Sequence, residues 1–418
     1  MIQNKKSSCW LGALMLVLTP ASAYAEAEYA VQAGSTAYRI YNPYQFPSSS
    51  GNGLKTSDNV YSTDLRAALF LPLPTDRSHL SLTGAVSKMQ YDTFRNLDYL
   101  KTQYIADYDW EYSDWVRGRF SRSTDVRLYT YFGGNFTNQE LPHLKENLGE
   151  VALRITPRFD IPVTLSNQSL RYTDPSNTRL YNMNSDVSQV ALRYESGIKS
   201  TLSTGFKQSR VNFPDRSASD ISAIDSGYTD RELFLDTRWR FAENTIVLGH
   251  LGNVQRQFAT LPNRNSNIPS YLIGVDWQYS LISSLGLRLI DQPQTNEQAD
   301  SRLYSVSRAV QGLATWQATP KIKVSLKGSL ETQTYQTFAN LGNAVVGNGT
   351  DKLKRFGARI DYDITPRLAL RTEAFTEKTV SNGGSTEYSR NSVQIGLHYT
   401  FENLVGNNRA RTQIDGLQ

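Results

Sequence analysis

Polar and apolar side chains alternate one by one along most of this 418-residue chain. Successive side chains of a β-strand point to opposite faces of its sheet, so a period of two predicts strands with one apolar and one polar face. The alternation is clearest in the segments 321–332, 355–364 and 393–401. In the first of these, Ile322, Val324, Leu326 and Leu330 alternate with Lys323, Ser325, Lys327 and Ser329. The pattern therefore predicts an all-β chain.

Two architectures contain such two-faced strands: a soluble β-sandwich and a β-barrel that spans a membrane. A sandwich seldom sustains strands of roughly ten residues over nearly 400 residues. Only 39% of the residues are hydrophobic, although 24 are tyrosines. This balance suits a barrel, which has no thick core and turns its polar face to water. No segment after residue 25 approaches the ~18 consecutive apolar residues of a transmembrane helix. We expect a single antiparallel, up-and-down transmembrane β-barrel.

The first 25 residues have the pattern of a secretory signal peptide. Lys5 and Lys6 supply its positive charge, the segment 11–18 is apolar, and Ala23-Tyr24-Ala25 is a cleavage site. The mature chain is therefore expected to begin after residue 25 and to reach the outer membrane of a Gram-negative bacterium, among its lipids.

Short polar turns recur every 37 to 46 residues, and longer segments rich in Asn, Ser, Gly, Asp and Pro lie between them. This pattern is typical of outer-membrane barrels, in which the short turns face the periplasm. Eight tight turns join sixteen strands, and one further strand at each end brings the expected number to eighteen, with sixteen still possible. The expected domains are a signal peptide over 1–25, a barrel over 26–401 and a short, unstructured periplasmic tail over 402–418. The turns are expected near 75–76, 113–114, 156–157, 196–197, 242–243, 280–284, 319–320 and 365–366.

Five tryptophans lie close to these tight turns, and therefore at one rim of the barrel. Aromatic side chains at the headgroup level form girdles in barrels of this kind, and a sugar-stacking platform is the alternative. Four of the five share the register of their apolar neighbours, whereas Trp115 has the opposite register and is the better candidate for an inward-facing ring. The rim tryptophans are Trp110, Trp115, Trp239, Trp277 and Trp316.

Catalytic and metal-binding motifs are absent from the sequence. The four histidines are far apart and none has a metal-ligand spacing, and there is no GxSxG elbow or Walker loop. Removal of the signal peptide would also remove the single cysteine, Cys9, and with it disulfides, thiolate metal sites and cysteine catalysis. We expect a protein that is not an enzyme and that has no cofactor.

Charged residues of both signs occupy the polar face, and in lipid each cation would cost roughly 2–4 kcal/mol. They are expected to line a wet lumen, either bracing it through cross-strand pairs or favouring anionic or hydroxyl-rich solutes. The densest basic group runs from Lys321 to Arg371 and is the candidate selectivity wall. The lumen candidates are Lys321, Lys323, Lys327, Arg355, Arg359, Asp361, Asp363, Arg371, Glu373, Arg238, Arg240 and Asp236.

The segment from Asn59 to Arg122 resembles the EpsL-type outer-membrane proteins of exopolysaccharide operons, within a broader group of β-barrel porins. The stretch 94–99 (FRNLDY), the stretch 109–112 (DWEY) and the stretch 115–118 (WVRG) carry the resemblance. Where family members often have an acidic residue after the first strand, this chain has Tyr38-Arg39-Ile40-Tyr41-Asn42.

This resemblance implies a conduit that exports a secreted polysaccharide beside periplasmic and inner-membrane synthesis components. The alternatives are a general or substrate-selective diffusion porin and, in third place, an outer-membrane enzyme or surface scaffold. The formal net charge of +5 is too small to argue for a nucleic-acid partner.

Overall fold

The computed structural model describes residues 27–42, 57–73, 77–126, 128, 140–173, 175–294, 302–337, 348–382, 387–403 and 409–416. These residues form one antiparallel sheet of eighteen strands in which every strand pairs with its neighbours in sequence. The first strand also pairs with the last, so the sheet closes into a barrel. Closure leaves no strand edge unpaired, as a hydrocarbon environment demands.

The strands are long enough to cross a bilayer, for which about 9–11 residues suffice. They are β1 (Glu28–Tyr41), β2 (Ser57–Pro72), β3 (His79–Tyr91), β4 (Tyr99–Ser113), β5 (Val116–Val126), β6 (His143–Thr156), β7 (Phe159–Arg171), β8 (Met183–Glu195), β9 (Thr201–Asn212), β10 (Gly227–Ala242), β11 (Thr245–Phe258), β12 (Ser266–Ser280), β13 (Ser283–Gln294), β14 (Arg302–Thr319), β15 (Ile322–Thr337), β16 (Asn348–Asp363), β17 (Leu368–Asn382) and β18 (Tyr388–Glu402).

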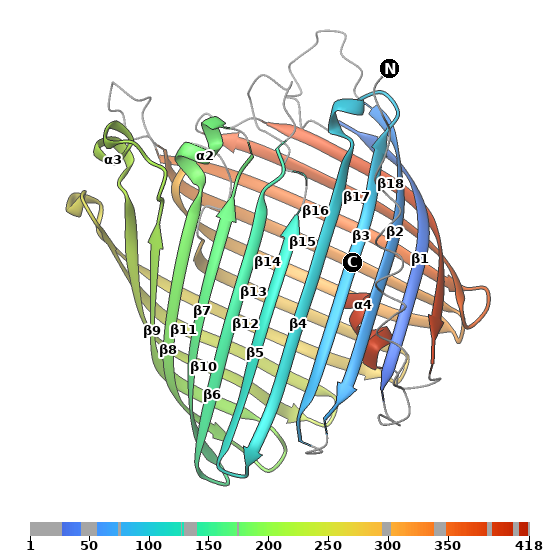
Figure 1. The fold of residues 1–418 in the computed structure, drawn as a ribbon, viewed down its shortest axis with the longest axis horizontal. Helices are drawn as coiled ribbons and strands as arrows, with labels where there is room; N and C mark the ends of the chain where they lie inside the picture. The colour runs from blue at the N-terminus through green and yellow to red at the C-terminus, as the bar shows by residue number, and fades with distance from the viewer. Residues whose placement is uncertain are drawn as a thin grey trace, which may run out of the picture.

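The expectation of eighteen strands is confirmed, and the alternative of sixteen is wrong. Seven of the eight tight turns lie where the sequence predicts them, with a break between strands at each position, and the turn predicted at 75–76 lies outside the described residues. Figure 1 shows these turns at one end of the barrel, which we call the tight-turn end; the other is the long-loop end. The predicted signal peptide lies outside the described residues. No helix among the described residues has the length and apolar character that a membrane span requires.

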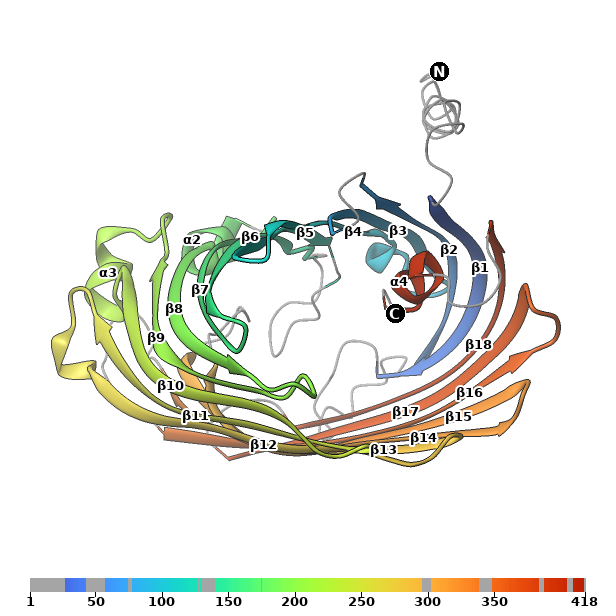
Figure 2. The ribbon, with the colours of Figure 1, turned by 90° about the horizontal axis from the view of Figure 1, so that it is seen from below.

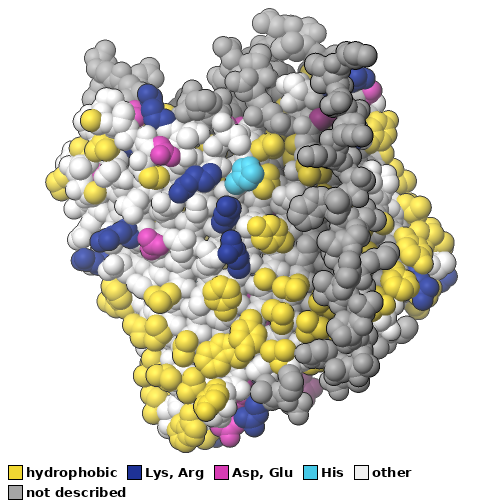
Figure 3. All heavy atoms as spheres, in the orientation of Figure 1, with side chains coloured by type: hydrophobic (Ala, Val, Ile, Leu, Met, Phe, Trp, Pro, Cys, Tyr) yellow, Lys and Arg dark blue, Asp and Glu magenta, His cyan; other side chains and the backbone are white. Residues whose placement is uncertain are grey.

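The two faces of each strand differ as the sequence predicts, and β10 is an example. Leu233 and Leu235 are 69% and 40% exposed, whereas Glu232, on the opposite face, is 7% exposed. Large apolar side chains exposed at alternate positions around the whole barrel form a surface suited to lipid rather than water. On the face in Figure 3, such side chains gather toward the tight-turn end, and charged side chains lie above them.

Three tight turns share one hydrogen-bond arrangement. In Thr156-Pro157-Arg158, the Thr156 hydroxyl oxygen accepts hydrogen bonds from the amides of Arg158 and Phe159, at 3.3 and 3.1 Å. Thr319 and Thr365 accept the corresponding pairs in the other two Thr-Pro turns, at 3.0 to 3.3 Å. The shared threonine thus satisfies main-chain donors that the turn leaves without a strand partner.

Carboxylates organise three of the loops at the long-loop end. Asp225 lies just before β10 and accepts hydrogen bonds from the amides of Thr260 and Leu261 in the β11–β12 loop. Asp58 in β2 does the same for Thr93 and Phe94 in the β3–β4 loop. These two loops carry the 3-10 turns η3 (Pro262–Arg264) and η2 (Arg95–Leu97).

The third loop, between β7 and β8, follows the same plan. There Glu140 accepts hydrogen bonds from the amide and the hydroxyl of Thr173, and the loop contains the helix α2 (Pro175–Tyr181). A further short helix, α3 (Ala218–Ile224), lies between β9 and β10. The carboxylate-held loops are therefore spaced four strands apart.

The interior contains an eight-residue helix, α4 (Arg409–Gly416), that the sequence does not predict. Figure 2 shows α4 inside the barrel beside β1, β2 and β3, the strands that it contacts. The expectation of an unstructured tail is therefore wrong for 409–416. Ala410 and Ile414 are fully buried against Ala30 and Ala68, and a short helix is stable only when such tertiary packing supports it.

Candidate functional site

Six of the lumen candidates, most of them from the predicted basic wall, line a cavity in the barrel interior. The cavity has a volume of about 400 Å³ and lies toward the tight-turn end of β15 to β17. Cross-strand register explains the grouping: Lys323 pairs with Asp361, which pairs with Arg371, so the three share a face in one row. The predicted residues in its lining are Lys323, Lys327, Arg359, Asp361, Asp363 and Arg371.

Ion pairs hold this wall in place. Both guanidinium groups bind Asp361, with Arg359 Nε at 2.9 Å and Arg371 Nε at 2.7 Å from its carboxylate. The ammonium of Lys327 lies 2.6 Å from Glu373. Gly357 makes room for it, because a Cβ there would lie 2.6 Å from Lys327 Cε. These ion pairs therefore fix the positions of the cationic side chains in the wall.

The other lumen candidates lie away from this cavity. Arg355 binds Glu331 and Glu377 at 3.1 and 2.7 Å, farther toward the long-loop end. Asp236 on β10 binds His250 at 2.7 Å, and Arg238 and Arg240 are exposed on the same face.

Lys321 differs from the expectation. It lies in the turn between β14 and β15 rather than in a strand, because the Thr319 hydroxyl accepts its amide hydrogen and bends the chain there. The basic wall therefore begins at Lys323.

A second cavity of about 270 Å³ lies against the same wall, between β16 and β4. Arg359 and Arg371 line both cavities. Its lining also contains His398 and Asp64, which are 3% and 4% exposed and face each other at 3.8 Å. Because the two cavities share Arg359 and Arg371, they are adjacent polar spaces in the barrel interior.

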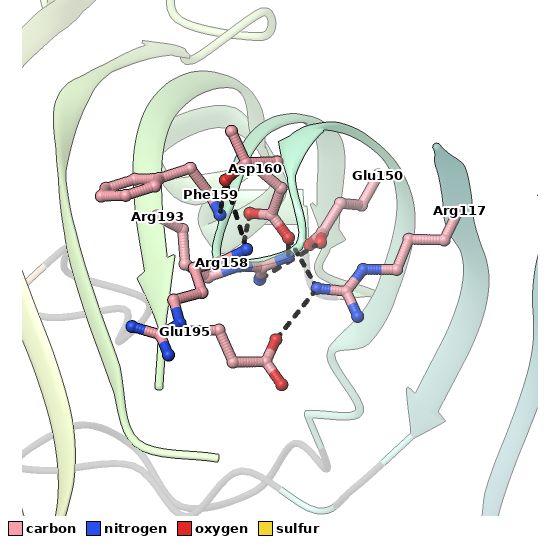
Figure 4. Close-up of polar contacts among 8 residues, drawn as sticks. Arg117, Glu150, Arg158, Phe159, Asp160, Arg193 and Glu195 are labelled. Atoms are coloured by element: carbon pink, nitrogen blue, oxygen red, sulfur yellow. Dashed lines mark hydrogen bonds and ion pairs between the residues drawn. The ribbon is translucent and has the colours of Figure 1, made fainter. Parts of the chain in front are cut away.

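Strands β5 to β8 carry a different network, centred on Asp160 (Figure 4). This carboxylate is 4% exposed and binds Arg117 at 2.6 Å and Arg193 at 2.8 Å. Glu150 and Glu195 complete the cluster, at 3.9 Å from Arg193 and 3.5 Å from Arg117. Three carboxylates face two cations here, so this network links strands β5 to β8 and adds no net positive charge to the lumen.

The rim tryptophans lie where the sequence places them. Trp110, Trp239, Trp277 and Trp316 belong to β4, β10, β12 and β14 and lie near their tight-turn ends. The last three are 39%, 39% and 52% exposed. Trp115 is 61% exposed and lies in the turn that precedes β5. The girdle remains a prediction, as does an inward-facing role for Trp115.

Four charged residues that matter here are not among the lumen candidates proposed from the sequence. Arg117 and Asp160 alternate with apolar neighbours, so the period-two pattern is sufficient to predict that both side chains lie on the polar face. Arg367 and Arg411 line the basic cavity from a turn and from α4, where no periodicity exists to place them. Among the described residues, no group of three His, Cys, Asp or Glu side chains is arranged to hold a metal ion.

A closed antiparallel barrel with a charged interior and an apolar exterior defines the class of this protein: it is a β-barrel of the outer-membrane type. No protein-family model matches the chain, and no curated protein matches it in sequence.

Solved structures with a similar fold include OccK1 (OpdK) of Pseudomonas aeruginosa, with a TM-score of 0.49 and 7% identity over 90% of this chain and 99% of the other. OccAB3 of Acinetobacter baumannii gives 0.48 and 8% over 90% and 100%. A mutant of the ferric enterobactin receptor of P. aeruginosa gives 0.44 and 8% over 89% and 81%. At these scores, the similarity carries no argument about the function of the chain.

Proposed function

We propose that this protein is a passive diffusion channel of the outer membrane with a preference for anions. The observation that carries the proposal is the basic cavity, in which six cations face two carboxylates. Eighteen strands are in the range of barrels wide enough for an aqueous channel. Fixed positive charge beside low-dielectric walls raises the local concentration of anions and slows the entry of cations.

Conductance in planar bilayers tests this proposal. The full chain, under a salt gradient of KCl, should give a reversal potential that corresponds to greater permeability for chloride than for potassium. The double variant Lys323→Glu/Lys327→Glu should shift the permeability ratio strongly toward potassium, because it reverses two charges of the wall.

A matched control is available on the opposite face. Lys88 and Lys145 are exposed and share the outward registers of Val86 and Val151. The variant Lys88→Glu/Lys145→Glu makes the same change in net charge outside the lumen and should leave the ratio close to that of the unmodified protein. Cation preference in the unmodified protein, or equal shifts in the two double variants, would contradict the proposal.

Export of a secreted polysaccharide is the second candidate, and the EpsL-type resemblance is what favours it. In the structure, the resembling residues have architectural roles. Asp98 binds the Tyr91 amide at 2.6 Å, and Trp110 covers Gly118, where a Cβ would lie 2.4 Å from its ring. Such roles suit a barrel with any cargo, so we rank export second.

A clean deletion strain tests the export candidate. Polymer trapped in the periplasm and loss of extracellular polymer would support it. Normal secreted polymer together with slower uptake of small anions would favour the diffusion channel.

A further inference from the structure

The helix α4 presents one face to the barrel wall and another to the lumen. Its apolar face is fixed by Ala410 and Ile414, both of which are 0% exposed. Polar contacts hold the same side: Gln413 donates to Ser81 at 2.7 Å, and its side-chain oxygen accepts from Thr83 at 3.3 Å. The guanidinium of Arg409 lies 4.7 Å from the ring centre of Phe70. The helix is therefore anchored to β1, β2 and β3.

Arg411 extends from α4 toward the opposite side of this corner. Its guanidinium binds Glu402 at the end of β18, at 3.0 Å, and the main-chain oxygen of Pro366 in the β16–β17 turn, at 3.3 Å. Arg411 also lines the basic cavity. The C-terminal helix thus contributes one cation to a site whose other cations come from β15, β16, β17 and a tight turn.

The charge balance of the cavity remains positive after its ion pairs are considered. Asp361 is shared by two arginines, Glu373 pairs with Lys327, Glu402 pairs with Arg411, and Asp363 also lines the cavity, so these four carboxylates offset four of the six cations. Within the described part of the chain, Lys323 and Arg367 make no ion pair; both are exposed and line the cavity, and the Arg367 guanidinium also lies 5.8 Å from the centre of the Phe401 ring. Guanidinium and ammonium donors that converge on one water-filled space match the geometry of an oxyanion.

We propose that α4 and the β15–β18 wall together form a binding site for an oxyanion group, a carboxylate or a phosphate, at the tight-turn end of the lumen. The proposal deepens the anion preference inferred above and rests on it. It adds that the site is composite: without α4 the wall loses one of its donors, and the corner of the lumen that the helix occupies opens (Figure 2).

Block of single-channel current by inorganic triphosphate tests the site. The full chain should show concentration-dependent block in KCl. Arg411→Gln keeps the side-chain length and removes the charge, and it should raise the half-blocking concentration by about tenfold, as expected for a lost charge-assisted hydrogen bond. Arg411→Lys should recover part of the block, because it restores the charge without the planar fork.

Two further variants separate the site from general effects on the helix. Arg409→Gln removes the same charge from the same helix outside the cavity lining, and its half-blocking concentration should stay within about twofold of the unmodified value, since a charge outside the binding site has little effect on affinity. Ile414→Asp should release α4 from the wall, because it places a charge in a fully buried position. It should both increase the conductance and weaken the block.

The outcomes distinguish this proposal from the proposed function. Anion-selective current with no triphosphate block, or block that is equal in Arg411→Gln and the unmodified protein, overturns the site and leaves the channel. If the protein does not conduct, the channel proposal fails. The site is then tested by calorimetric titration of triphosphate into the detergent-solubilised protein, with the same variants. Equal affinity of Arg411→Gln and the unmodified protein overturns the site there.

Discussion

Single carboxylates hold the loops at the long-loop end, and Asp225 is the clearest case. It is 1% exposed, and its φ of 78° is unusual for a residue with a side chain. Burial favours the neutral carboxyl, but hydrogen bonds from Thr260, Leu261 and Ser226 outweigh burial and lower the pKa of Asp225 below its ordinary value of 3.8. The ionised carboxylate is therefore the form that the folded loop stabilises.

This lowered pKa gives the first prediction. The stabilising contribution of Asp225 is complete above its unfolded-state pKa near 3.8 and disappears as the pH falls from there through the lower folded-state pKa. Asp225→Ala should speed amide hydrogen exchange at Thr260 and Leu261 at neutral pH, by on the order of tenfold, because a charged acceptor is worth about 1.5–3 kcal/mol. The difference from the unmodified protein should shrink in acid.

The equivalent loop supplies an internal control for this measurement. Thr93 and Phe94 are held by Asp58 in the same way, and their exchange should be the same in Asp225→Ala and the unmodified protein. Equal exchange at Thr260 in both proteins at neutral pH would show that the carboxylate does not hold the loop.

At the scale of single elements, the sequence predicts strands and tight turns well but predicts α4 not at all. Strand 322–337 is recognisable because alternation is a local property that survives without its neighbours. The Thr-Pro turns are recognisable because proline and threonine impose their geometry locally. The segment 409–416 has few apolar residues, and its helix depends on Ala30 and Ala68, which are more than 300 residues away in the sequence.

The shared threonine of the turns gives the second prediction. Thr365→Val keeps the side-chain shape but removes the acceptor for the Arg367 and Leu368 amides. It should lower the free energy of unfolding by about 1 kcal/mol, the net value of a typical hydrogen bond. Thr365→Ser keeps the oxygen and should cost less. Urea titration of folding into lipid vesicles measures both, and equal stability of the two variants would contradict the role of the hydroxyl.

At the scale of the whole molecule, closure, strand number and the two-faced wall could be predicted, whereas the distribution of charge around the lumen could not. Register identifies Arg193 and Arg371 alike as inward-facing. In the folded barrel, three carboxylates surround Arg193 and Arg117, whereas Arg371 lines a cavity together with five other cations. The sequence alone does not show this difference. The cavity lined by six cations therefore lies on one side of the lumen, beside β15 to β17.

This one-sided charge gives the third prediction, which concerns ionic strength. The screening length is about 10 Å at 0.1 M salt and about 3 Å at 1 M. The exposed side chains Lys323 and Arg367 act on passing ions through water, so their field reaches across a wide lumen only in dilute salt. The chloride-to-potassium permeability ratio should be highest at 0.1 M KCl and should approach one at 1 M.

A ratio that stays constant over this range would mean that selection occurs by close contact rather than by the field of the wall. In that case we expect selection at the proposed oxyanion site beside α4, where Arg411 and the cations of the wall line one cavity.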